Sequence, residues 1–130
     1  MIGSKHISLT AIAALALVPA AASAKHGGDR GVRVAGTCGH GATSRLKLKN
    51  DGGVIEVEFE VDQNRVGKRW HVTLVRDGKV VYRGQRTTAA PSGSFSVERR
   101  IRNLAGADRI TARGAGPNGL TCVASATLAA

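Results

Sequence analysis

The fold is decided by one stretch of sequence, residues 45–62, which reads RLKLKNDGGVIEVEFEVD. Apolar and charged side chains alternate at every second position on both sides of the DGG, which is typical of two β-strands that each turn one face to a core. We expect a hairpin with Asp51-Gly52 as a two-residue turn, because this places apolar residues opposite apolar residues and opposite charges across the pair. The expected pairs are Leu48 with Ile55, Leu46 with Val57, Lys47 with Glu56 and Arg45 with Glu58.

The same alternation runs through the rest of the chain from Val32 onward, and no segment repeats at helical spacing. About seven to eight short strands with turn signals between them favour an all-β fold, an antiparallel β-sandwich, with a small closed β-barrel as the alternative. The expected strands are 31–37, 43–49, 54–62, 69–76, 79–86, 95–102, 108–113 and 120–127.

Two further hairpins are predicted from the match of apolar faces. In each we expect a turn that ends in a left-handed glycine bulge, Gly78 in the first and Gly119 after Pro117 and Asn118 in the second. The expected inner pairs are Leu74 with Val80, Val72 with Tyr82, Ala112 with Ala124 and Ile110 with Ala126.

The first two dozen residues have the three parts of an export signal: Lys5, an apolar run over 7–18, and small residues over 22–24. We expect cleavage after Ala24, which makes 1–24 a signal peptide, 25–31 a flexible lead and 32–130 one domain. A buried N-terminal helix is the weaker alternative. The mature protein has no further apolar run long enough to span a membrane, so we expect it to be secreted, or periplasmic if the source has an outer membrane.

The chain has two cysteines, Cys38 and Cys122. Export exposes thiols to oxidising conditions, so we expect one disulfide between them. The alternative is a metal site that also uses His40, but it lacks a paired Cys-x-x-Cys.

Three runs, RVAGTCGHGATSRLKLK, VEFEVDQNRVGKRWHVTLVRDGKVVYRG and PSGSFSVERRI, resemble a group of small secreted actinobacterial proteins of uncharacterised activity. The order of elements is similar to immunoglobulin-like and fibronectin type III-like sandwiches. Trp70 lies farther after Cys38 than in an immunoglobulin domain. The resemblance therefore implies a sandwich and carries no activity or site residue with it.

The chain is strongly basic, with a formal net charge of +10 at pH 7. In the strand that begins at Phe95, Arg100 and Arg102 fall on the outward parity and predict a short cationic ridge. The candidate anion-binding residues are Arg83, Arg86, Arg100 and Arg102. All four aromatic residues that could stack on bases or sugars, Phe59, Trp70, Tyr82 and Phe95, are assigned to inner faces.

Other candidate chemistry has a simpler explanation. Four carboxylates, Glu56, Glu58, Glu60 and Asp62, alternate along one strand and could bind calcium or act as an acid and base, but opposite lysines and arginines make an ordinary exposed face the better interpretation. The histidines are scattered. We therefore predict no catalytic residue, no cofactor and no metal, and no enzyme. The predicted function is a non-catalytic secreted binding or structural module with an unknown partner, and the alternative is a basic domain held on anionic cell-envelope polymers or nucleic acid.

Overall fold

The computed structural model describes residue 3 and residues 31–129. Apart from Gly3, the expected signal peptide (1–24) lies outside the described residues, as does all of the expected lead except Gly31. Gly31 itself is the first residue of a strand and pairs with Lys49. Within the described part, no helix is long and apolar enough to cross a membrane.

Apart from a short 3-10 turn, η1 (Pro117–Gly119), all the regular secondary structure of the described residues is β-strand. The strands are β1 (Gly31–Ala35), β2 (Thr37–Cys38), β3 (Thr43–Asp51), β4 (Val54–Asp62), β5 (Arg69–Arg76), β6 (Lys79–Thr87), β7 (Ser94–Arg102), β8 (Asp108–Ala115) and β9 (Thr121–Leu128). They form a four-stranded sheet in the order β1-β3-β4-β7 and a five-stranded sheet in the order β2-β9-β8-β5-β6. Every pairing is antiparallel and neither sheet closes, so the sandwich is confirmed and the barrel alternative is wrong.

The first expected strand, 31–37, is two strands, because the chain changes sheets at Gly36. β1 pairs with β3 in one sheet, and β2 pairs with β9 in the other. A Cβ atom at Gly36 would lie 2.0 Å from the Ser44 hydroxyl oxygen and 2.9 Å from the Val123 carbonyl oxygen. Only glycine fits at this crossing. The division of the first strand gives the described part of the chain nine strands.

The core lies between the sheets and consists of the inward side chains predicted by the alternation. Trp70 is fully buried, as expected, and its ring centroid lies 5.8 Å from that of Phe95 on the opposite sheet. The largest fully buried hydrophobic side chains are Trp70, Phe59, Leu46, Leu48, Ile55, Leu74 and Ile110. Burying them supplies most of the favourable free energy of folding.

The register of the β3–β4 hairpin differs from the expected one by two residues. Asp51 pairs with Val54, so the turn is Gly52-Gly53, and both glycines have positive φ (51° and 83°). A two-residue hairpin turn of this kind needs positive φ at both central positions, which two glycines adopt at no steric cost. The faces are as predicted because a shift of two preserves parity. The pairs are Leu48 with Val57, Leu46 with Phe59, Lys47 with Glu58, Lys49 with Glu56 and Arg45 with Glu60.

The prediction for the β5–β6 hairpin was wrong in the type of turn and in the position of the bulge. The turn is a plain two-residue turn, Asp77-Gly78, and the irregularity lies within the strand, where Val75 pairs with Val80 and Leu74 with Tyr82. Val81 is thus the extra residue of a bulge, which brings Tyr82 back to the inner parity. The expected pairs of Leu74 with Val80 and Val72 with Tyr82 do not form.

The predicted residue pairs of β8 and β9 are confirmed: Ala112 pairs with Ala124, and Ile110 with Ala126. Asn118 and Gly119 take positive φ in the turn (57° and 73°).

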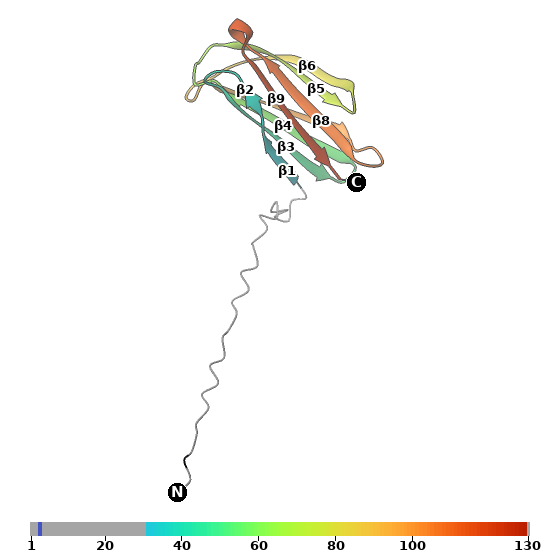
Figure 1. Cartoon of the computed structure of the whole chain (residues 1–130). Coiled ribbons are helices and arrows are strands. Elements are labelled where there is room, and N and C mark those ends of the chain that lie inside the picture. The colour runs from blue at the N-terminus through green and yellow to red at the C-terminus, as the bar shows by residue number, and fades with distance from the viewer. Residues whose placement is uncertain (1–2, 4–30, 130) are drawn as a thin grey trace.

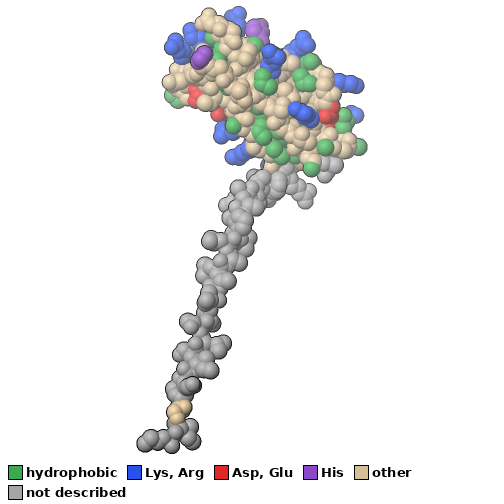
Figure 2. Space-filling view, viewed as in Figure 1, with side chains coloured by type: hydrophobic (Ala, Val, Ile, Leu, Met, Phe, Trp, Pro, Cys, Tyr) green, Lys and Arg blue, Asp and Glu red, His purple; other side chains and the backbone are tan. Residues whose placement is uncertain are grey.

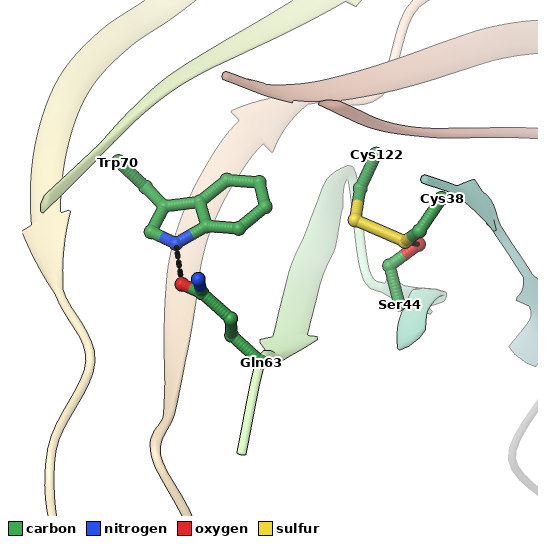
Figure 3. Close-up of a disulfide and its surroundings, with 5 residues drawn as sticks. All are labelled: Cys38, Ser44, Gln63, Trp70 and Cys122. Carbon is green, nitrogen blue, oxygen red and sulfur yellow. Dashed lines mark hydrogen bonds between the residues drawn. A yellow bond between two sulfur atoms is a disulfide. The ribbon is translucent and has the colours of Figure 1, made fainter. Parts of the chain in front are cut away.

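The expected disulfide is present and joins β2 to β9 through Cys38 and Cys122. Cys122 is fully buried, and the Ser44 hydroxyl oxygen lies 3.3 Å from the Cys38 sulfur (Figure 3). The bond closes a loop with a sequence separation of 84, which in the chain-entropy model stabilises the fold by about 4 to 5 kcal/mol. A buried disulfide is typical of an oxidising, extracellular-type environment. The alternative metal site fails because both sulfurs are bonded to each other.

The antiparallel order places the chain's connections at two opposite ends of the sandwich (Figure 1). The start of β1 and the end of β9 lie at one end. The other end, which we call the loop end, carries the β2–β3, β4–β5, β6–β7 and β8–β9 connections. In an immunoglobulin constant domain the second strand has the first and fifth strands as neighbours. Here β3, which follows the split first strand, lies between β1 and β4, so the strand order differs from that of an immunoglobulin constant domain.

Candidate anion-binding surfaces

The four arginines predicted to bind anions do not form one surface. Arg100 and Arg102 lie on β7 of the four-stranded sheet, whereas Arg83 and Arg86 lie on β6 of the five-stranded sheet. Arg83 points outward beside Thr73, but Arg86 pairs with the buried Trp70 and therefore falls on the inner parity of an edge strand. Its guanidinium donates to the Gln85 carbonyl oxygen at 2.8 Å.

The expected ridge on β7 is largely neutralised. Arg100 points outward as predicted, but its guanidinium forms ion pairs with Glu56 and, at 3.2 Å, with Asp51. On the next strands, Arg45 forms an ion pair with Glu60 at 3.3 Å. The outer face of the four-stranded sheet therefore matches its cations with carboxylates, which leaves little net field to attract an anion.

The carboxylate stripe on β4 is part of this matched face. Asp62, at its end, accepts a hydrogen bond from the Asn64 backbone N–H at 2.8 Å and so forms a local turn. Across β7, Glu58 lies opposite Glu98, while Glu56 lies opposite Arg100. Among the described residues, no group of three or more His, Cys, Asp or Glu side chains is placed to hold a metal ion.

The outer face of the five-stranded sheet is different, because its charged side chains are all cations. Arg83 and Arg113 lie on either side of Thr73, in one row across β6, β5 and β8. Thr111 and Ser125 share a hydrogen bond of 2.8 Å between their hydroxyls on the same face. We call this surface the arginine–threonine face; its outward residues include Arg69, His71, Thr73, Arg83, Thr87, Arg109, Thr111, Arg113, Ser125 and Thr127.

No carboxylate of the described residues points outward on the arginine–threonine face. Of the two acidic residues nearest to it, Asp77 lies in the β5–β6 turn and accepts the Arg109 backbone N–H at 3.0 Å, and Asp108 is buried. The three ion pairs found in the described part of the chain all involve Arg45 or Arg100 of the other sheet. The two sheets thus differ sharply in charge. Figure 2 shows more blue Lys and Arg side chains than red Asp and Glu side chains on the visible side, in keeping with the net charge of the chain.

The aromatic residues give this face no stacking platform. Phe59, Trp70 and Phe95 are buried, as predicted. Tyr82 is only half-buried, and the Arg99 guanidinium lies over its ring at 4.6 Å, a cation–π contact between the edge strands of the two sheets. Arg99 lies on the inward parity of β7, between Val97 and Ile101, and its exposed side chain leaves the core at this edge.

A cleft of about 420 Å³ opens at the loop end, and sequence reasoning did not find it. Three connections far apart in the sequence line it, β2–β3, β4–β5 and β8–β9. Its lining includes Arg65, Lys68 and His40 and contains no carboxylate. The sequence shows two basic residues, Arg65 and Lys68, on either side of Gly67. They point to a site only when the fold brings the three connections together.

Asp108 is the other feature that the sequence did not reveal. It is the first residue of β8, pairs with Leu128, and is 1 % exposed. Neither of its carboxyl oxygens has a hydrogen-bond partner in the described part of the protein. A buried carboxyl group without a partner costs stability.

The fold and these surfaces define a class of protein: a small antiparallel β-sandwich, closed by one disulfide, with one cationic outer face. No protein-family model matches the chain, and no curated protein is significantly similar to it.

Proposed function

We propose that the protein is a secreted, non-catalytic binding module that holds anionic polymers on its arginine–threonine face. The polymers are anionic components of the cell envelope. Nucleic acid, which is also a polyanion, is the alternative ligand. The segregation of charge between the two sheets is the observation that carries this proposal. The N-terminal signal pattern and the buried disulfide support secretion.

The geometry of the face suits a flexible polyanion. Arg83 and Arg113 are separated by one strand, which places their backbones roughly 10 Å apart. Arginine donates forked hydrogen bonds to phosphate, sulfate and carboxylate groups, and the threonine hydroxyl between them can donate as well. Because the aromatic rings are turned inward, such binding depends on charge and should weaken steeply as salt is added.

We expect the double variant Arg83→Gln/Arg113→Gln of the mature protein to elute from a heparin column at clearly lower salt than the unmodified protein. The double variant Arg45→Gln/Arg100→Gln is the matched control, because it removes the same charge from the carboxylate-rich sheet. We expect this control to elute close to the unmodified protein.

Equal losses in the two double variants would mean that net charge, and not the arginine–threonine face, governs binding. Retention that survives high salt would show that charge is not the driver at all. Circular dichroism of each variant would establish that the sandwich is intact.

A further inference from the structure

The loop-end cleft has the charge and the dimensions of a small-molecule site. Its volume of about 420 Å³ lies within the ordinary range for ligand pockets. The side chains of Arg65 and Lys68 make no ion pair within the described residues, and both line the cleft. Pro117 and Leu120 add an apolar wall, and Gln63 and Asn118 add amide groups.

The cationic wall of the cleft is held rigidly by Thr88, which is 2 % exposed. The Thr88 hydroxyl donates to the Arg65 carbonyl oxygen and accepts the Lys68 N–H at 2.9 Å. The Thr88 backbone donates to the Lys68 carbonyl oxygen and accepts the Gly67 N–H, each at 2.8 Å. One buried residue therefore fixes the backbone of both cations, and such preorganisation lowers the entropic cost of binding.

The β6–β7 connection supports the same loop from behind. A Cβ atom at Gly93 would lie 2.3 Å from the Arg65 backbone nitrogen, so the two segments are in close contact.

The other walls are anchored to the core. The Gln63 side-chain oxygen accepts a hydrogen bond from the Trp70 indole N–H at 2.9 Å (Figure 3). A Cβ atom at Gly116 would lie 2.5 Å from the Trp70 ring, so the β8–β9 connection packs directly on this side chain. The disulfide holds Gly39 and His40 beside this connection, because Cys38 is bonded to Cys122.

We propose that this cleft binds a phosphate group carried on a small polyol. Arg65 offers a forked donor and Lys68 a compact point charge, a combination that suits phosphate oxygens. A lone phosphate would fill only a small part of the cleft, whereas an attached polyol would reach the amides of Gln63 and Asn118 and the wall formed by Leu120. The cleft lies at the loop end and not on the arginine–threonine face, so this site goes beyond the proposed function and is tested separately.

The test is a titration of the ¹⁵N-labelled mature protein with glycerol 3-phosphate, inorganic phosphate and glycerol. We expect glycerol 3-phosphate to shift the backbone amides of Gly39, Lys68 and Gly119 with one-site saturation. Inorganic phosphate should shift the same amides with weaker affinity, and glycerol should shift none of them. This map decides the location of the site without any variant.

The variant Arg65→Gln/Lys68→Gln should bind glycerol 3-phosphate at least about tenfold more weakly, since hydrogen bonds to charged groups are lost. The matched control Arg83→Gln/Arg113→Gln should bind it with unchanged affinity. Shifts centred on β5, β6 and β8, equal affinity for inorganic phosphate, or unchanged binding by the cleft variant would each overturn the proposal. None of these results depends on retention by heparin, so the two proposals can fail independently.

Discussion

The buried carboxyl group of Asp108 lowers the stability of the fold. Its carboxyl group is buried at the start of β8 without a partner among the described residues, while the neighbouring Asp77 is exposed and hydrogen-bonded. A buried polar group without a partner costs about 1 to 3 kcal/mol in stability. Replacing it by an apolar side chain of similar shape should recover part of this cost.

We therefore expect Asp108→Leu to raise the free energy of unfolding by about 0.5 to 2 kcal/mol, measured by urea denaturation. The control is Asp77→Asn, which removes the same charge nearby but keeps an oxygen that can accept the Arg109 N–H. We expect the control to change stability by less than about 0.5 kcal/mol. A loss of stability in Asp108→Leu would show that the carboxylate has a partner in solution.

Single residues were predicted well where alternation decided their side. Trp70, Val72 and Leu74 share the inner face of β5 as their spacing predicts. Asp108 also follows the inner parity, but no pattern in the sequence shows that a carboxyl group at a strand's first residue will be covered. Burial there depends on the packing of the sheet ends, which is set by tertiary structure.

Among the strands, the sequence predicted the faces more reliably than the partners. The β8–β9 pairing was predicted correctly, and the β3–β4 pairing was displaced by two residues because Gly52-Gly53 and Asp51-Gly52 are both good turns of the same parity. In β5–β6, the bulge at Val81 leaves Val80 exposed. The bulge could not be predicted because Val80 and Val81 are adjacent, so that either parity of the strand would place a valine on the inner face.

The change of sheets between β1 and β2 depends on Gly36, and it gives a test at the level of the elements. We expect Gly36→Ala to lower the free energy of unfolding by about 1 to 3 kcal/mol, because the new methyl group would overlap the Ser44 hydroxyl and press on the Val123 carbonyl. The measurement is again urea denaturation of the oxidised protein.

Gly52→Asn is the matched control for this change. Nothing lies within 4 Å of a Cβ atom at Gly52, and asparagine tolerates the positive φ of its turn. Its stability should stay within about 0.5 kcal/mol of the unmodified protein. If Gly36→Ala were as stable as the unmodified protein, the chain would have room for a methyl group at this crossing, which would contradict the close contacts of Gly36.

Across the whole molecule, the high net charge was evident from composition, but its distribution was not. Arg83, Arg86, Arg100 and Arg102 were predicted as candidate anion-binding residues, and only Arg100 and Arg102 were predicted to share a ridge. The fold separates the four between two sheets. The strand order decides which cations lie beside carboxylates. The local alternation of apolar and polar residues does not predict which sheet a strand joins or which strands are its neighbours. The cleft at the loop end was missed for the same reason, since its three walls come from distant parts of the chain.

The most direct test of the charge segregation is an amide chemical-shift map of the ¹⁵N-labelled mature protein with a short heparin oligosaccharide at low salt. We predict shifts concentrated on the outward residues of β5, β6 and β8, with Thr73, Arg83 and Arg113 among the largest, and their disappearance as salt is added. Shifts centred on β3, β4 and β7, or spread evenly over both sheets, would contradict a binding surface on the arginine–threonine face.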